Sequence, residues 1–503
     1  MLARATACSV HGLAGVPVLV EADITNGLPN FTIVGLTDRA IQEARERVRA
    51  SIRNAGFDFP MRRLTVNLAP AEIPKEGTGF DLPIAMAILC LSRPMRLAGH
   101  AFIGELALDG SIRPVAGVLP MARCLGAAGV RRLVVAEENA AEAALVDSLE
   151  VVGVSSLQRC VGHLDGSQPL PLARPGEAPL PDEAADLAEV RGQEQAKRAL
   201  EIAAAGGHNL LMVGPPGSGK TMLARAFCSL LPDLDNEQSL EVAALYSLRG
   251  ALRERPPTAT RPPFRAPHHS VSRAGLIGGG SGLARPGEIS LAHHGVLFLD
   301  EVCEFSRSHL EALRQPLEAR EVSVARSRGA VMFPADFVLV AAANPCPCGH
   351  LGDEAGCRCT LRALGEYSSR LSGPIRDRID LVIDVPRQRY TDLFDRPATE
   401  CSATVRERIS VARALQSRRN PVSPGGATHN AALHGRELHD TAGATAAATR
   451  LLALAGERLR LSARGFFRVL RVARTIADLR GAAEVGEPDV AEALRFRGEV
   501  PRS

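Results

Sequence analysis

The chain has 503 residues, and the usual size of a domain predicts about three folding units, which excludes a single small binding module. Hydrophobic residues make up 46% of the chain and charged residues 23%, a balance typical of soluble globular proteins and of neither disordered nor membrane proteins. The 59 basic residues nearly balance the 56 acidic ones, which leaves a net charge of +3. Any basic surface for a polyanion must therefore arise from local clustering.

The cysteines and the apolar segments predict the compartment. The chain has 11 cysteines, and most of them stand alone, which fits a reducing cytoplasm better than a small secreted disulfide framework. The apolar stretch Leu82–Ser92 is well short of the roughly 20 residues that cross a bilayer. His11 and Glu21 interrupt the N-terminal apolar residues, so no signal peptide is expected. We expect a cytoplasmic protein without a membrane partner.

Taken in chain order, the elements predict an α/β protein with a helical end. Residues 1–165 alternate short apolar runs with helix-like stretches such as Ala40–Asn54, which indicates an α/β domain. Residues 166–184 are rich in Pro and Gly and read as a linker. Residues 185–395 form a second α/β region with several short buried strands, and residues 396–503 are helical and rich in Ala, Leu and Arg.

A phosphate-binding loop follows the apolar strand Leu210–Val213 and precedes a helical segment. Backbone N–H groups can turn inward around phosphate oxygens only where a Cβ does not intervene, which is the reason for the glycines. Lys220 would reach the β- and γ-phosphates of ATP, and Thr221 would ligate Mg²⁺. The residues of the loop are Gly214, Pro215, Pro216, Gly217, Ser218, Gly219, Lys220 and Thr221.

A carboxylate pair stands at the end of another predicted strand. Asp300 would hold Mg²⁺ through water, and Glu301 would act as general base toward the attacking water. Such pairs are also common at solvated loop ends, so the pair indicates a nucleotide site only in combination with the phosphate loop. Asn344, at the end of the strand Val338–Ala342, could orient the water, and the segment around Val190 is expected near the adenine.

The order of these motifs resembles that of AAA+ ATPases, in the branch of the magnesium-chelatase ATPase subunit and the MCM helicases. The resemblance implies that Asn344 is the sensor-1 residue and that Arg378 is the arginine finger for the neighbouring subunit's ATP. Arg376 is the weaker candidate for that role. Arg464, in Ser462–Gly465, would sense the γ-phosphate from a C-terminal helical lid. A finger acting in trans requires a closed homo-oligomer, a hexameric ring in this branch.

The N-terminal segment Pro74–Asp81 resembles the stretch of Lon proteases that carries the nucleophilic serine, and Gly104–Gly117 resembles the stretch before the catalytic lysine. The resemblance implies a Lon-like (ribosomal S5 domain 2-like) fold. Gly79 stands at the serine position and Leu119 at the lysine position. Peptide hydrolysis by this dyad needs both the hydroxyl and the amine, so we do not expect a protease.

Nearly the whole chain is similar to the ComM/YifB family. The similarity is carried by Phe31–Leu36, Val66–Pro70, Phe264–Ser270 and Arg471–Leu479. The family implies a hexameric ATP-driven motor with helicase activity that moves branch points in DNA during homologous recombination and natural transformation. One rival reading is a metal-insertion ATPase of the magnesium-chelatase type. The other is a non-motor regulator that merely binds ATP.

A predicted β-hairpin, Glu321–Phe333, could contact single-stranded or branched DNA. In related helicases the equivalent hairpin projects into the central pore, which would bring Arg326 and Arg328 to the phosphate backbone. The alternative is an exposed hairpin with solubilising arginines. The glycine-rich segment Leu276–Gly282 could be a second, flexible pore element. Arginines 45, 47, 49 and 53 on a predicted helix are typical of a solvated face.

Two further groups contain residue types that can bind metals. Four clustered cysteines directly after Asn344 could close a tetrahedral Zn²⁺ site, although the pairs are CxC instead of the commoner CxxC, and unmetallated thiols are the alternative. These residues are Cys346, Cys348, Cys357 and Cys359. His293 and His294 are adjacent and should point to different faces, so chelation of one ion by both is not expected.

Overall fold

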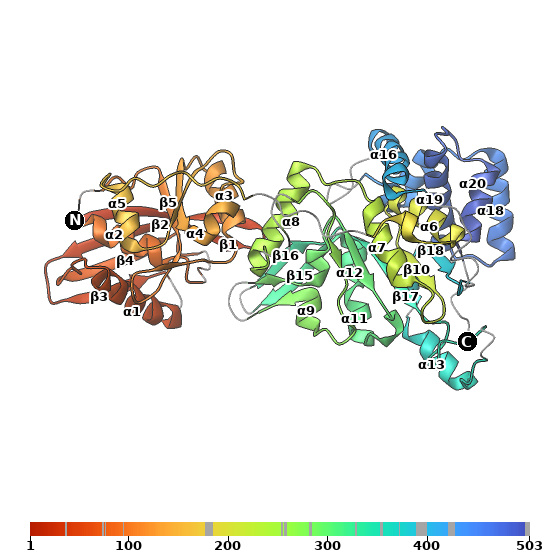
Figure 1. Ribbon diagram of the computed structural model, residues 1–503, viewed down its shortest axis with the longest axis horizontal. Coiled ribbons are helices and arrows are strands. Elements are labelled where there is room, and N and C mark those ends of the chain that lie inside the picture. The colour runs from red at the N-terminus through yellow and green to blue at the C-terminus, as the bar shows by residue number, and fades with distance from the viewer. Residues whose placement is uncertain are drawn as a thin grey trace.

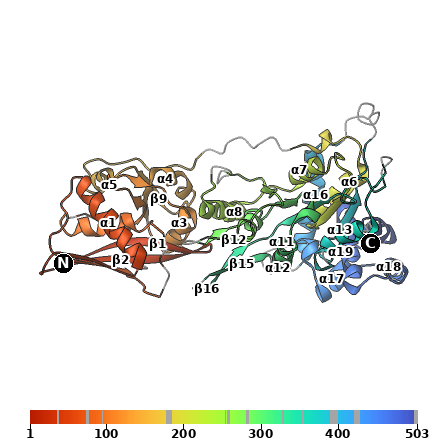
Figure 2. The same cartoon turned by 90° about the horizontal axis from the view of Figure 1, so that it is seen from below.

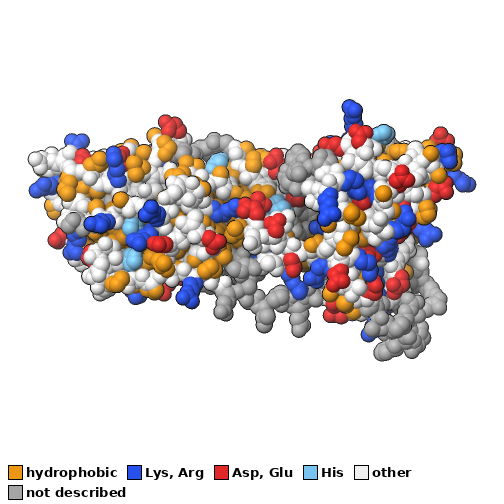
Figure 3. All heavy atoms as spheres, turned by 90° about the horizontal axis from the view of Figure 1, so that it is seen from above, with side chains coloured by type: hydrophobic (Ala, Val, Ile, Leu, Met, Phe, Trp, Pro, Cys, Tyr) orange, Lys and Arg blue, Asp and Glu red, His pale blue; other side chains and the backbone are white. Residues whose placement is uncertain are grey.

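The computed structural model is elongated, with an N-terminal lobe at one end and a nucleotide-binding-type core and helical region at the other (Figure 1). On the face drawn in Figure 3, acidic and basic side chains are interspersed, in keeping with the near balance of charge. None of the described helices combines the length and apolar character needed to cross a bilayer. The structure describes residues 1–35, 38–72, 75, 77–93, 95–176, 185–252, 255, 259–280, 284–326, 329–352, 356–371, 373–388, 400–420 and 428–497.

The N-terminal lobe is built on a seven-stranded mixed sheet with strand order β3-β4-β2-β1-β5-β8-β9. The first two strands form a long antiparallel hairpin, and β5, β8 and β9 continue the sheet in parallel. The strands are β1 (Leu2–His11), β2 (Ala14–Thr25), β3 (Asn30–Val34), β4 (Arg63–Ala69), β5 (His100–Ile103), β8 (Arg132–Ala136) and β9 (Glu150–Val154), with a small ribbon of β6 (Glu105–Leu106) and β7 (Ile112–Arg113).

Five helices cover this sheet. The helix α1 turns Ala44, Val48 and Ile52 inward at a spacing of four residues, whereas α2 is apolar all round and is buried along most of its length. The helices are α1 (Asp38–Asn54), α2 (Asp81–Cys90), α3 (Val118–Ala127), α4 (Glu137–Ala143) and α5 (Leu157–Leu164). Beyond α5, residues 177–184 of the predicted linker lie outside the described residues.

The core carries a five-stranded parallel sheet with strand order β11-β14-β17-β10-β18. The central strands are buried on both faces, which explains their continuous apolar sequences. The strands are β10 (Leu210–Val213), β11 (Phe264–Arg265), β14 (Val296–Leu299), β17 (Val338–Ala343) and β18 (Leu381–Asp384). The mixed α/β class predicted from the sequence is confirmed.

Helices surround the core sheet, and a helical region follows it. The elements of the core are η1 (Leu187–Glu189), α6 (Glu194–Gly206), α7 (Lys220–Leu230), α8 (Asn236–Arg249), α9 (Arg273–Ile277), α10 (Glu288–Leu291), η2 (Val302–Glu304), α11 (Arg307–Ala312), α12 (Arg314–Ala319), α13 (Leu361–Arg370) and α14 (Gly373–Arg376). The C-terminal elements are α16 (Ser402–Arg419), η3 (Asn430–Ala432), α17 (Gly435–Ala442), α18 (Ala446–Arg458), α19 (Ala463–Leu479) and α20 (Glu487–Arg495).

The predicted hairpin is present as β15 (Glu321–Arg326) and β16 (Gly329–Pro334), paired antiparallel from Glu321 opposite Pro334 to Arg326 opposite Gly329. It extends toward the N-terminal lobe (Figure 2). The turn between β1 and β2 approaches it closely, since a Cβ at Gly12 would lie 2.9 Å from the carbonyl oxygen of Met332. Arg328 lies outside the described residues.

The glycine-rich segment is more ordered than a flexible loop. Leu276 and Ile277 end the helix α9, and Leu276 is fully buried. Gly278 and Gly279 form β12, which pairs with β13 (Arg285–Pro286). The expectation of a flexible loop was therefore wrong for residues 276–279, because burial of Leu276 fixes the start of the segment. Residues 281–283 lie outside the described part.

The N-terminal lobe rests on the core through α3 and α8. The backbone N–H of Gly117 donates to the carbonyl of Ser247 at 3.0 Å, and Arg123 forms an ion pair with Glu237. Leu119 is fully buried in a small apolar cluster with Ala243 and Ala244 of α8. Leu119, which the resemblance places at the Lon lysine position, thus serves as a packing contact between the lobes.

Leu119→Lys tests this contact. Burial of an ammonium group in this apolar cluster should weaken the lobe contact by about 3 kcal/mol. We expect faster cleavage within residues 166–184 during limited proteolysis. The control Leu108→Lys, at a position 56% exposed on the same lobe, should cleave like the wild type. Equal cleavage of all three proteins would contradict the packing role of Leu119.

Candidate nucleotide and metal sites

The phosphate loop connects β10 to α7, whose first residue is Lys220. Gly217 and Gly219 have φ of 75° and 90°, a left-handed conformation that strongly favours glycine. A Cβ at either position would meet no protein atom within 4 Å. The loop therefore leaves open space over the N-terminus of α7, a cradle that fits phosphate oxygens.

Lys220 occupies this cradle with its own amine. Its Nζ donates to the carbonyl oxygens of Gly214 at 2.7 Å and Pro215 at 2.9 Å, and to Oδ1 of Asn344 at 3.3 Å. Burial lowers the pKa of Lys220, while the nearby carboxylates of Asp300 and Glu301 oppose that shift. Phosphate oxygens could replace these neutral acceptors, so the amine is already oriented for an anion.

A hydroxyl and a carboxylate meet at the carboxyl ends of the core strands. Thr221 Oγ1 donates to Asp300 Oδ2 at 3.0 Å, which brings together the two oxygens expected to bind Mg²⁺. The next residue, Glu301, has φ 49° and ψ 48°, a strained conformation for a glutamate, and its side chain is exposed. The strand β14 thus ends in a turn that leaves a carboxylate free beside the expected metal ligands.

Val190 differs from its expected surroundings. Its side chain is only 4% exposed and belongs to the apolar cluster that includes Leu223 of α7. It therefore has a packing role, and its contribution to adenine binding stays a prediction.

Arg378 and Arg464, the predicted finger and sensor, lie near the amino ends of the core strands. The phosphate loop lies at the carboxyl ends. Arg378 precedes β18, and β18 runs parallel to β10 with Leu210 opposite Leu381 and Val213 opposite Asp384. The phosphate loop begins after Val213, so the length of a four-residue strand, about 13 Å, lies between the two groups along the sheet. Arg378 is therefore on the wrong edge to serve the phosphate loop of its own chain.

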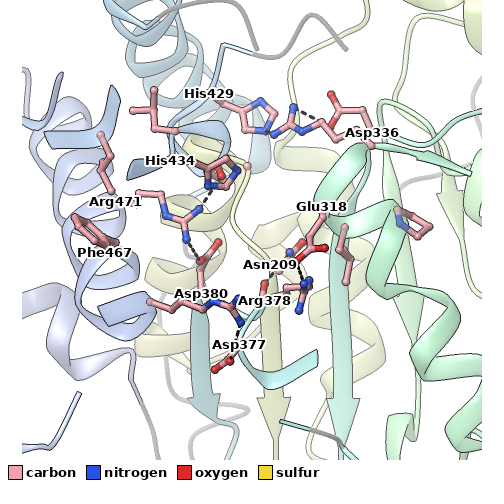
Figure 4. A pocket seen from close by; sticks show the side chains of 18 of the residues that line it. Asn209, Glu318, Asp336, Asp377, Arg378, Asp380, His429, His434, Phe467 and Arg471 are labelled. Carbon is pink, nitrogen blue, oxygen red and sulfur yellow. Dashed lines mark hydrogen bonds and ion pairs between the residues drawn. The ribbon is translucent and has the colours of Figure 1, made fainter. Parts of the chain in front are cut away.

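Arg378 and Arg464 share a cleft of about 480 Å³ between the core and the C-terminal helices (Figure 4). Arg378 is ion-paired with Glu318 of α12, and its side chain is only 10% exposed. Arg464, at the start of α19, pairs with Asp377 at 3.6 Å and is 69% exposed. Burial lowers the pKa of Arg378, and the positive charges of Arg314 and Arg464 lower it further.

Arg468 of α19 anchors the segment that carries Arg378. Its Nη1 donates to the carbonyl oxygens of Arg376 at 2.9 Å and Ile379 at 2.6 Å. Arg376 itself donates from Nε to the carbonyl of Leu371, which gives it a structural contact. The sequence does not indicate these roles of Glu318 and Arg468, because a glutamate or arginine on a helix carries no local signal of a distant partner.

The base of the hairpin is tied to the C-terminal helices. Arg320 and Asp336 flank the two strands and form an ion pair at 3.2 Å. The Nη2 atom of Arg320 lies 3.2 Å from Nε2 of His429. Burial lowers the pKa of His429 to about 3, so its neutral ring accepts this bond. Movement of the C-terminal region can thus reach the hairpin through one arginine.

The four clustered cysteines converge. Their Sγ atoms all lie within 4.8 Å of one another, with 3.3 Å between Cys346 and Cys348, 3.7 Å between Cys348 and Cys357, and 3.6 Å between Cys357 and Cys346. Four sulfurs around Zn²⁺ at about 2.3 Å would lie about 3.8 Å apart, so Cys359 and these three residues fit the ion. Backbone N–H groups of His350 and Arg358 lower the pKa of Cys348 to about 6.

The cysteine segment also touches the phosphate loop. A Cβ at Gly349, whose φ is 81°, would approach the ring of Pro216 to 2.6 Å. Glycine is thus required for this close approach. The segment joins the loop on one side and Asn344 on the other.

The expectation that His293 and His294 point to different faces was wrong. His294 has φ 57°, and this turn stacks the two rings with their centroids 3.7 Å apart. Both Nε2 atoms reach Oε2 of Glu241, at 3.3 and 3.0 Å. His293 Nδ1 accepts from the N–H of Asp336, so its neutral ring carries the proton on Nε2 and donates it to Glu241. The group is a hydrogen-bonded cluster, whose histidines lower the pKa of Glu241.

Comparisons with known proteins agree with this geometry. Residues 186–393 match the family described as magnesium chelatase, subunit ChlI, residues 20–139 match subunit ChlI of Mg-chelatase, and residues 399–497 match the ChlI C-terminal family. The competence protein ComM of Haemophilus influenzae is 43% identical over 96% of this chain and 95% of its own length. The uncharacterized protein YifB of Escherichia coli is 42% identical over 97% and 95%.

A shorter match is to a protease. Lon protease of Mycolicibacterium smegmatis is 25% identical over 159 residues, which cover 29% of this chain and 20% of that protein. The Lon-like character predicted from the sequence agrees with this match. The assignment of Gly79 and Leu119 to the positions of the two catalytic groups stays a prediction.

Proposed function

Because the chain belongs to the ComM/YifB family of magnesium-chelatase-like AAA+ proteins, we propose that it is a ring-forming ATPase that moves branch points in DNA. The process is homologous recombination, including integration of incoming strands during natural transformation. The name of the Haemophilus relative, a competence protein, favours this reading. The observation that supports the proposal is that the phosphate loop and Arg378 lie at opposite ends of neighbouring parallel strands.

In this proposal, one protomer binds ATP and its neighbour completes the site. Lys220 binds the β- and γ-phosphates, Thr221 and Asp300 hold Mg²⁺, and Asn344 orients the attacking water for Glu301, the general base. Mg²⁺ neutralises charge on the phosphates when it is bound. Arg378 and Arg464 approach from the amino edge of the next protomer. A closed ring, a hexamer in this family, gives every protomer such a neighbour.

The arginine finger must exchange partners when the ring closes. In the isolated chain, Glu318 neutralises Arg378, and the γ-phosphate of a neighbour would take its place. The same segment is held by Arg468 of α19. Since α19 belongs to the C-terminal region, ATP hydrolysis at the neighbour's site can move that region. The contact between His429 and Arg320 then transmits the movement to the hairpin.

The DNA contact is assigned to the hairpin β15–β16, in the stretch of sequence that contains Arg326 and Arg328. Six copies around one strand would create a basic channel despite the net charge of +3. Contact with phosphates, independent of sequence, suits a chain with no tryptophan and 3 tyrosines. The proposed binding of DNA and ATP and the free cysteines are consistent with a cytoplasmic protein.

Strand exchange on a labelled three-stranded junction tests this function. Wild type should displace the labelled strand with ATP, whereas Lys220→Ala and Glu301→Gln should each slow hydrolysis at least about 100-fold and abolish displacement. Arg326→Ala should reduce displacement, and the control Arg362→Ala, at an 88% exposed side chain, should not.

The outcomes separate the rival functions. Absence of displacement by the wild type would refute branch migration, and ATPase stimulation by a chelatase partner instead of DNA would favour metal insertion. Displacement that persists in Arg326→Ala would remove only the hairpin assignment. ATP turnover unchanged in Glu301→Gln would favour a regulator that merely binds nucleotide.

The cysteine cluster is assigned a structural Zn²⁺ that fixes Asn344 beside the phosphate loop. Elemental analysis of purified full-length protein should give about one zinc per chain, and Cys348→Ser with Cys357→Ser should give none. The exposed Cys401→Ser is the matched control and should keep the metal. Wild-type protein that is purified without chelators, lacks zinc and still hydrolyses ATP would refute the assignment.

A further inference from the structure

The N-terminal lobe carries a basic hollow. The elements α1 and β3, which border it, lie in the part of that lobe that is remote from the core (Figure 1). The hollow lies between the outer side of α1, the first residues of β3 and the segment that enters β4. Arg45 and Arg49 of α1 and Arg62 before β4 line it, with Phe59 beside them. We call these four residues the arginine hollow.

The positive charge in this hollow exceeds the negative charge around it. Glu46 is the one acidic side chain among the lining residues. Within the described part of the chain, no ion pair involves Arg45, Arg49 or Arg62. By contrast, Arg47 on the same helix is held by the buried carboxylate of Asp81 at 2.7 and 3.2 Å, a structural role.

Arg45 supplies a second observation. Its Nε atom is buried and has no hydrogen-bond partner in the structure. A buried donor without an acceptor costs free energy, and an incoming acceptor would remove that cost. The hollow thus contains a donor that its own chain leaves unsatisfied.

The shape of the hollow indicates the class of ligand. Its volume, about 110 Å³, is far below that of a typical site for a small-molecule cofactor. It suits an extended chain that touches the surface at repeated points. Phe59 is partly exposed, and the guanidinium of Arg49 lies 5.9 Å from its ring centre. Arginines beside an aromatic ring are the combination that holds phosphates and stacks bases in single-strand binding proteins.

We propose that the arginine hollow is a second binding site for single-stranded DNA, separate from the hairpin of the core. This inference rests on the proposed function, in which DNA is the substrate. The two sites lie on different lobes of the elongated chain, so a strand that leaves the pore can be held again by the N-terminal lobe. That lobe, which lacks a protease dyad, thereby acquires a task in DNA handling.

The salt dependence of binding tests the site. Fluorescence anisotropy of labelled oligothymidylate with full-length protein, measured over a range of salt, gives log Kd against log salt. Removal of one arginine that binds a phosphate of single-stranded DNA should reduce the slope by about 0.7, so Arg49→Gln with Arg62→Gln should reduce it by about 1.4. Affinity at low salt should fall about tenfold or more. Both residues are exposed, so folding should survive.

Arg113→Gln with Arg159→Gln is the matched control, because it removes the same charge from exposed positions of the same lobe outside the hollow. The control should keep the wild-type slope. Equal slopes in wild type and the hollow variant, with weaker binding in Arg326→Gln, would overturn the hollow and leave the proposed function intact. No DNA binding by the wild type would instead refute the function itself. A hollow variant that no longer binds polyglutamate but still binds DNA would identify an acidic protein as the ligand and overturn the inference.

Discussion

The direction of the strands in one parallel sheet separates the residues of the candidate nucleotide site into two groups. All strand ends meet at one edge, where Lys220, Thr221 and Asp300 lie together, and all strand starts meet at the other, near Arg378. No side chain spans that distance. In the proposed function, the arginines that complete the site therefore come from another copy of the chain, and assembly is coupled to hydrolysis.

Lys220 and Arg378 are held in place by contacts that a phosphate could replace. The amine of Lys220 rests on carbonyl oxygens, and Arg378 rests on Glu318; a phosphate is a stronger partner than either. Arg468 ties the finger segment to α19, while Arg320 ties the hairpin to His429. The C-terminal region therefore contacts both the segment that carries the proposed arginine finger and the base of the hairpin proposed to bind DNA.

Local patterns made much of this predictable. The phosphate loop, the Asp300–Glu301 pair and the hairpin are continuous in sequence, and their glycines and alternating residues report local conformation directly. The contacts of Arg378 with Glu318 and of Leu119 with α8 join distant segments and leave no local trace. The stacking of His293 on His294 depends on a positive φ at a non-glycine residue, which no pattern signals, and Leu276 is ordered by burial that only the packed core supplies.

A mixing experiment tests the divided site most directly. Lys220→Ala keeps the finger and loses the phosphate loop, whereas Arg378→Ala keeps the loop and loses the finger, so each alone should lose at least about 99% of the ATPase activity. After disassembly and joint reassembly at equal amounts, random rings should contain intact interfaces at about a quarter of their positions and regain a corresponding rate. A mixture no more active than the sum of its two inactive components would contradict the account.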